Sequence, residues 1–117
     1  AIGMTHDEII AKYGTPFSDE DGSITYLIAG GYVNIAVFYL DSKTNKCLDC
    51  GLIVNENIKS STFVEFLNSK YTVYEKGTLA DGSKYKWING ATIAESSMGV
   101  TYFPTKKTIL YQQIKNR

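Results

Sequence analysis

The sequence predicts a single α+β domain, in which an antiparallel sheet is packed on one face by two short helices. Its 117 residues are a usual length for one domain and are enough to bury a core. Most apolar residues stand in short runs rich in β-branched and aromatic side chains, separated by turns that contain glycine. Two segments instead begin with Thr-x-x-Glu and continue with the apolar spacing of a helix.

The first helix is predicted to begin at Thr5, because Thr5 and Glu8 form a capping box. In such a box the Glu8 amide donates to the threonine oxygen, and the Thr5 amide donates to the Glu8 carboxylate. Gly14, followed by Pro16, is expected to end the helix, since glycine is favoured just past a helix and proline cannot continue one. The apolar face of this helix consists of Ile9, Ile10 and Tyr13.

Three strands are predicted after this helix, over residues 23–29, 32–40 and 47–54. The first follows an Asp21-Gly22 turn. The second is entered through Gly30-Gly31, where glycine gives the backbone freedom to turn. The third returns after a polar hairpin loop.

A second helix is predicted where Thr62 and Glu65 repeat the capping-box pattern. Its apolar positions are Phe63, Phe66 and Leu67. The strands predicted after it cover residues 72–79, 83–89, 91–103 and 108–114. The first two form a hairpin around Asp81-Gly82, and the third is expected to bend near Gly99.

The two halves align with each other, which predicts a tandem α-β-β-β repeat over residues 1–58 and 59–117. The order of the matches is preserved, and the offset rises only from 57 to 63 residues. Identities are few, so a chance alignment is the alternative. The matches are Thr5 and Glu8 with Thr62 and Glu65, Asp21-Gly22-Ser23 with Asp81-Gly82-Ser83, Gly30 with Gly90, and Val37 and Tyr39 with Val100 and Tyr102.

The first helix carries a recognisable motif: Gly3-Met4-Thr5, then Glu8-Ile9-Ile10 and Gly14-Thr15-Pro16. It resembles the helix of β-lactamase-inhibitor-protein-like domains and of SmpA/OmlA-type small lipoproteins of the bacterial outer membrane. The motif covers about 14 of the 117 residues. The second half departs from it, with Ser60-Ser61-Thr62 in the first position and no Gly-x-Pro after Tyr71. The resemblance implies a tandem fold and an extracytoplasmic protein that binds another protein without catalysis.

The charge balance argues against a nucleic-acid partner. Twelve basic and twelve acidic residues give a formal net charge of zero, whereas binding to phosphates needs many uncompensated cations. Residues 1–60 carry a net charge of −4 and residues 61–117 a net charge of +4. This difference is either chance or the sign of two lobes of opposite potential. No run approaches the roughly 20 apolar residues that span a bilayer, so no transmembrane segment is expected.

Cys47 and Cys50 form a C-x-x-C motif within a predicted strand. In a regular strand, residues three apart face opposite sides and lie about 10 Å apart, whereas a disulfide needs Cα atoms within about 7 Å. A bond between them therefore requires a bulge or a turn. Three alternatives are open: two unpaired strand cysteines, a local or interchain disulfide, and a redox or metal site.

No catalytic, cofactor or metal site is expected elsewhere. His6 is the one histidine and falls at the first helical position, where no nucleophile or orienting group is indicated. The acidic turn at residues 19–22 lacks the spacing of a calcium loop. The sequence contains no G-x-S-x-G and no H-E-x-x-H motif, and Gly30-Gly31 is not followed by the lysine of a phosphate loop.

Aromatic residues are the leading functional candidates. Nine tyrosines, five phenylalanines and one tryptophan make up 13% of the chain. Tyrosine and tryptophan are favoured at interfaces because they bury a large area at a small entropic cost. We expect a partner-binding surface on the sheet face not covered by helices, the alternative being that these rings fill the core. The candidates are Tyr85, Trp87, Tyr102 and Tyr111.

The sequence therefore favours a non-enzymatic protein-binding module, inhibitor-like or part of the cell envelope. One alternative is a structural envelope lipoprotein domain with no discrete ligand pocket. A second is a thiol- or metal-dependent site at the C-x-x-C motif. The sequence sets neither the partner nor the oligomeric state.

Overall fold

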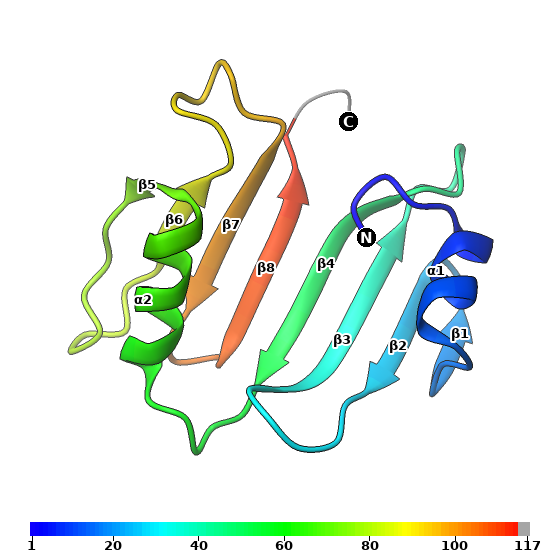
Figure 1. Cartoon of the computed structure of the whole chain (residues 1–117), viewed down its shortest axis with the longest axis horizontal. Helices are drawn as coiled ribbons and strands as arrows, with labels where there is room; N and C mark the ends of the chain where they lie inside the picture. The colour runs from blue at the N-terminus through cyan, green and yellow to red at the C-terminus, as the bar shows by residue number, and fades with distance from the viewer. Residues whose placement is uncertain (115–117) are drawn as a thin grey trace.

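The computed structural model describes residues 1–114, and within them eight strands form one antiparallel sheet (Figure 1). The order along the chain is one helix and four strands, followed by a second helix and four more strands. The first half contains α1 (His6–Tyr13), β1 (Ser18–Glu20), β2 (Ser23–Leu27), β3 (Val33–Leu40) and β4 (Cys47–Val54). The second contains α2 (Ser60–Lys70), β5 (Thr72–Glu75), β6 (Tyr85–Ile88), β7 (Met98–Phe103) and β8 (Thr108–Gln113).

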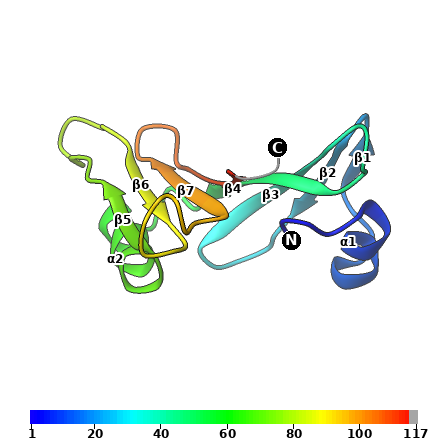
Figure 2. The ribbon, with the colours of Figure 1, turned by 90° about the horizontal axis from the view of Figure 1, so that it is seen from above.

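The two halves meet where β4 pairs with β8 in the middle of the sheet. The strand order is β1-β2-β3-β4-β8-β7-β6-β5, so each half is a meander with its first strand at an outer edge. At this junction Leu52 pairs with Ile109, and Cys50 pairs with Tyr111. Both helices lie on the same side of the sheet (Figure 2). The predicted α+β class, with two helices on one sheet face, is confirmed.

Helix α1 begins and ends as the sequence predicts. The Glu8 amide donates to Thr5 Oγ1 at 3.3 Å, and the Thr5 amide donates to Glu8 Oε1 at 2.9 Å. Gly14 ends the helix with a positive φ of 84°, and its amide donates to the Ile10 carbonyl. The capping box therefore forms because both partners are local in sequence.

Helix α2 begins earlier than predicted, and the capping box predicted for it does not form. The helix starts at Ser60, so Thr62 lies inside the first turn and its amide donates to the Lys59 carbonyl. A residue inside the helix cannot cap it. The helix start is instead held by tertiary contacts, because Ser60 Oγ accepts hydrogen bonds from Tyr102 Oη at 2.8 Å and from Lys107 Nζ at 3.1 Å.

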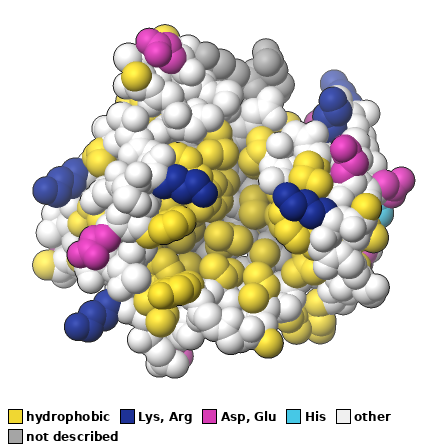
Figure 3. All heavy atoms as spheres, viewed as in Figure 1, with side chains coloured by type: hydrophobic (Ala, Val, Ile, Leu, Met, Phe, Trp, Pro, Cys, Tyr) yellow, Lys and Arg dark blue, Asp and Glu magenta, His cyan; other side chains and the backbone are white. Residues whose placement is uncertain are grey.

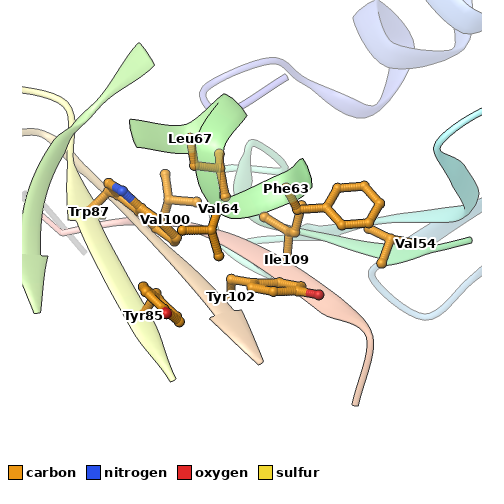
Figure 4. Close-up of a cluster of buried hydrophobic side chains, with 9 residues drawn as sticks. All are labelled: Val54, Phe63, Val64, Leu67, Tyr85, Trp87, Val100, Tyr102 and Ile109. Atoms are coloured by element: carbon orange, nitrogen blue, oxygen red, sulfur yellow. The ribbon is translucent and has the colours of Figure 1, made fainter. Parts of the chain in front are cut away.

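Each helix covers its own apolar cluster on the shared face. In the first half, Ile9 of α1 packs with Ile24, Ala36, Phe38 and both cysteines. In the second half, α2 packs on β6, β7 and β8, and Trp87 Nε1 donates to Asn68 Oδ1 of α2 at 3.0 Å (Figure 4). The residues of this second cluster are Val54, Phe63, Val64, Leu67, Tyr85, Trp87, Val100, Tyr102 and Ile109.

The strand predictions are correct for β4 and are overturned at three places. The strand predicted over 72–79 ends at Glu75. Residues 18–20 pair with β2 as edge strand β1, although only a turn was predicted there, so the first half has four strands and not three. Residues 91–97 form a loop, and the strand predicted over 91–103 begins only at Met98. Side-chain hydrogen bonds replace the sheet pairing in this loop: Ser96 Oγ donates to the Thr92 carbonyl and accepts from the Gly90 amide.

The four sequence matches between the halves have different outcomes in the structure. Gly30 and Gly90 both lie in the connection between the second and third strands of their half, but Gly30 has a positive φ and Gly90 does not. Gly22 and Gly82 both have positive φ and both lie in the connection between the first and second strands of their half. The capping boxes do not match, because the second one is absent. Tyr39 and Tyr102 lie on corresponding strands but face opposite sides of the sheet, since Tyr102 is in the core under α2 and Tyr39 is not.

His6 links helix α1 to the sheet edge. Its Nδ1 lies 2.9 Å from Asp7 Oδ1, and its Nε2 lies 2.7 Å from Asp19 Oδ2 on β1. These hydrogen bonds, first to Asp7 and then to Asp19, raise the pKa of His6 above its ordinary value. The expectation that His6 is a surface residue holds only in part, because its ring is partly covered and joins two elements.

We expect Trp87→Ala to lower the free energy of unfolding by about 3–5 kcal/mol, since a buried aromatic ring is lost and a cavity is left. Phe66→Ala is the matched control, because the Phe66 ring lies on the adjoining helix but is 54% exposed. Its cost is expected to be below about 1 kcal/mol. Urea denaturation followed by far-ultraviolet circular dichroism measures both. Equal costs would contradict the assignment of Trp87 to the core.

The His6 contacts predict a pH dependence of stability. The folded state raises this pKa above the unfolded value of 6.5, so the contribution is complete below that pH. It is lost as the pH rises through the folded-state pKa. Thermal unfolding across this range is expected to show a falling midpoint, and Asp19→Asn should flatten that decline. Asp21→Asn, in the neighbouring turn, is the control and should keep it. An unchanged slope in Asp19→Asn would refute the role of this contact.

Candidate functional site

The four aromatic residues predicted to bind a partner lie on the wrong face of the sheet for that role. Tyr85, Trp87 and Tyr102 are 8%, 1% and 0% exposed, and α2 covers them (Figure 4). The Tyr85 and Trp87 rings stack at a centroid distance of 5.8 Å. Strand alternation correctly places Tyr85 and Trp87 on one face, but that face is the one on which the helix packs. These three rings therefore fill the core, which was the alternative to a binding surface.

Tyr111, the fourth predicted residue, is half-buried at the junction of the halves. It packs against both apolar clusters, a property that it shares with Leu52. Its ring lies 6.3 Å from the Tyr71 ring at an interplanar angle of 67°. Burial, followed by the proximity of the Tyr71 hydroxyl, raises the pKa of Tyr111. Tyr111 also lines a cavity that is described below.

The sheet face opposite the helices presents apolar side chains that the sequence analysis did not single out. Leu27, Tyr39 and Ile53 on this face are 57%, 46% and 40% exposed. The register makes the surface continuous, because Leu27 pairs with Ile35, which pairs with Ile53. We call this surface the open face, and it consists of Leu27, Ile35, Val37, Tyr39, Ile53, Phe103 and Leu110.

The open face has few charges for a surface of its size. On the described strands β3, β4, β7 and β8, Asp49 is the one charged residue at a position that faces this side. An antiparallel sheet with one face in water normally alternates apolar and polar residues. Strand β3 does not, because Ile35, Val37 and Tyr39 face one side while Ala36 and Phe38 face the other. This composition is typical of a strand covered on both sides.

The signal for the open face was present in the sequence. After Asn34, residues 35–40 contain no polar side chain except the tyrosine hydroxyl. Tyr39 also lies over a position with no side chain of its own, since a Cβ at Gly51 would stand 3.9 Å from the Tyr39 ring. The ring is thereby free to spread over the neighbouring strand. The lack of alternation, and not the number of aromatic residues, identifies this surface.

A cavity of about 380 Å³ lies on the other face, between α2 and the junction of the two halves. Leu52 and Ile109, which pair across that junction, are among the residues that line it. Apolar side chains gather in this hollow between the two lobes, with basic side chains at its border (Figure 3). The remaining lining residues are Tyr32, Val33, Thr62, Phe63, Phe66 and Tyr111.

One end of the cavity carries polar groups. Lys70 Nζ lies 5.7 Å from the Phe66 ring centroid and 5.8 Å from that of Tyr71. Tyr71 in turn contacts Tyr111, which lines the cavity. Burial is the largest cause that raises the pKa of each of these two tyrosines, so both hydroxyls keep their protons at ordinary pH. The two side chains are also hydrogen-bonded to each other, so this end offers one cation and one free hydroxyl donor.

The cysteines of the C-x-x-C motif are free and buried. A β-bulge is present: Tyr39 pairs with Asp49 but Leu40 pairs with Cys47, which leaves Leu48 as the extra residue. The bulge turns Cys47 to the same side as Cys50, and both thiols enter the first-half cluster. Burial raises the pKa of Cys47, and burial together with the charge of Cys47 raises that of Cys50 to about 12. Within the described residues the two thiols are not bonded to each other, as in the first of the three alternatives.

His6 and the cysteines do not form a common site. The two ring nitrogens of His6 contact Asp7 and Asp19, as described above. Cys47 Sγ donates to the Asp49 carbonyl at 3.2 Å. Among residues 1–114, no group of three or more His, Cys, Asp or Glu side chains is arranged to hold a metal ion.

Two comparisons with known proteins find no match, and a third finds a distant one. No model of a known protein family matches the sequence, and no curated protein matches it. Within the described residues, no helix is both long enough and apolar enough to cross a membrane. Among solved structures, the fold is similar to that of an extracellular protein containing an SCP domain from Bacillus anthracis, with 11% identity and a TM-score of 0.47. The match covers 97% of this chain but only 44% of that protein, and at this TM-score it supports no transfer of function.

Proposed function

We propose that this protein is a non-enzymatic binding module that holds another protein against the open face of its sheet. The observation that carries the proposal is the apolar and nearly uncharged surface across β2, β3, β4, β7 and β8, on the side away from both helices. Contiguous exposed apolar surface on a soluble protein marks an interaction site. A pleated sheet face is also rigid, so little entropy is lost on binding.

The chemistry of the open face defines the partner that it fits. Its centre is formed by Val37, Tyr39 and Ile53, and a partner should cover these residues with apolar side chains of its own. Tyr39 is the expected energetic centre because it combines a large exposed ring with a polar tip. Asp49 faces this side directly opposite Tyr39, and further charge stands at the margin, where Lys106 Nζ lies 5.6 Å from the Phe103 ring. Such a margin suits the polar rim of a protein interface.

The titratable side chains also support a role without catalysis. The thiol pKa values are raised, whereas a nucleophilic cysteine needs a lowered pKa. His6 is engaged with two carboxylates in joining α1 to β1. These residues thus have structural tasks in the folded chain, and a thiol-dependent enzyme is the less favoured alternative.

The family proposal and the tandem repeat rest on the shared order of elements. Each half has one helix followed by four antiparallel strands, and the Asp-Gly-Ser turns occupy corresponding connections. We take the repeat to be α-β-β-β with an additional outer strand, and the chain to be β-lactamase-inhibitor-protein-like and extracytoplasmic. The alternative is a structural envelope lipoprotein domain with no discrete ligand pocket, and the cavity beside α2 makes it the less favoured proposal.

The proposal is tested by placing a photoreactive side chain at Ile53 in the native organism and identifying the protein that becomes crosslinked. The purified partner is then titrated against Tyr39→Lys. We expect affinity to fall at least tenfold, because the substitution removes the ring at the expected energetic centre and places there a cation that must lose its water on binding. The free energy of unfolding should change by less than about 1 kcal/mol, since Tyr39 is a surface residue.

Ser61→Lys is the matched control for this experiment. It introduces the same charge at an exposed position of α2, on the opposite side of the sheet. An equal loss of affinity in both variants would contradict the proposed surface. Sedimentation equilibrium supplies a second check: a dimer of this chain that Tyr39→Lys dissociates would mean that the open face binds a second copy and not a different protein.

A further inference from the structure

The cavity beside α2 has the size and the composition of a small-molecule site. Its volume of about 380 Å³ lies within the range of about 300–1,000 Å³ that is usual for ligand pockets. Aliphatic side chains of β4 and β8 and aromatic rings of α2 form its walls. The Phe63 ring of α2 meets the ring of Tyr32 edge to face at 6.4 Å, which joins the loop before β3 to the helix.

A single stripe of α2 borders the cavity and ends in a cation. Thr62, Phe66 and Lys70 are spaced four residues apart, so their side chains follow one another along the same side of the helix. The first two line the cavity, and Lys70 Nζ lies close to the ring of the second. Among residues 1–114, no carboxylate forms an ion pair with Lys70. Its charge is therefore available at the edge of an apolar space.

The hydroxyls of Tyr71 and Tyr111 stand near the same end. Tyr111 lines the cavity, and Tyr71 lies under the Lys70 ammonium. Both groups are protonated at neutral pH, and their side chains are hydrogen-bonded to each other, so the pair has one free hydroxyl donor. One cation and one free hydroxyl donor at one end of an otherwise apolar space suit an anion attached to a hydrocarbon chain.

We propose that this cavity binds an aliphatic carboxylate of medium chain length, with the chain against Leu52, Phe63 and Ile109 and the carboxylate beside Lys70. The chain replaces water against apolar walls, which favours binding in proportion to the area covered. The carboxylate keeps partial contact with solvent because Lys70 is exposed, so its desolvation cost is small. This site is on the helix side of the sheet and is independent of the open face.

Decanoate and its uncharged analogue decanol are the probes, and isothermal titration calorimetry measures their affinity for the full chain. Lys70→Gln is expected to weaken decanoate binding roughly two- to fivefold and to leave decanol unchanged, because an exposed ion pair contributes up to about that factor. Lys12→Gln is the matched control: Lys12 also lies over an exposed ring, that of Tyr13, but on α1. The Lys12→Gln substitution should change neither the affinity for decanoate nor that for decanol.

Thr62→Trp fills the cavity from an exposed position of α2 and should abolish binding of both probes. Circular dichroism checks that this variant is folded, and methyl shifts of Leu52 and Ile109 on adding decanoate to the unchanged chain locate the ligand without any substitution. Three results would overturn the proposal: no saturable binding of decanoate, equal effects of the two lysine substitutions, or ligand-induced shifts confined to other residues. Tyr39→Lys should bind decanoate normally, which separates this test from that of the open face.

Discussion

The pairing of β4 with β8 joins two otherwise separate meanders into one sheet. Each half forms a helix-covered meander, and the two meanders share a sheet only through this ladder, with Leu52 opposite Ile109. The ladder fixes the faces of all eight strands, because side chains alternate along each strand and align across neighbouring ones. Both helices must then lie on the face that carries Cys50, Leu52, Ile109 and Tyr111. The cavity beside α2 and the open face are two results of this one arrangement.

Local rules allowed α1 and β4 to be predicted from the sequence. The capping box at Thr5 and Glu8 needs no partner beyond the next turn, and β4 is a long apolar run between polar loops. The same rules failed where tertiary contacts decide. Strand β1 is Ser-Asp-Glu, which has little strand preference, and it is extended because β2 pairs with it. Helix α2 begins at Ser60 because Tyr102 and Lys107 donate to that hydroxyl.

The functional surfaces were harder to predict than the elements, for a physical reason. Strand alternation shows that Tyr85 and Trp87 share a face, but it does not show which face a helix will cover. That pair was predicted to bind a partner because aromatic residues are numerous, whereas the unbroken apolar run in β3 is the pattern that identifies the open face. The cavity was beyond prediction, since its walls come from α2, β4, β8 and the loop before β3, which are joined only by the fold.

The position of the β4–β8 junction has a mechanical consequence. Leu52 and Tyr111 are the half-buried residues that pack against both clusters, and they lie on the ladder that joins the lobes. The cavity beside α2 and the open face are on the two sides of this ladder. When a sheet flexes, one side is compressed as the other is stretched, so any motion that squeezes the hollow must spread the opposite surface. In this way the cavity beside α2 and the open face, which share no residues, are mechanically coupled.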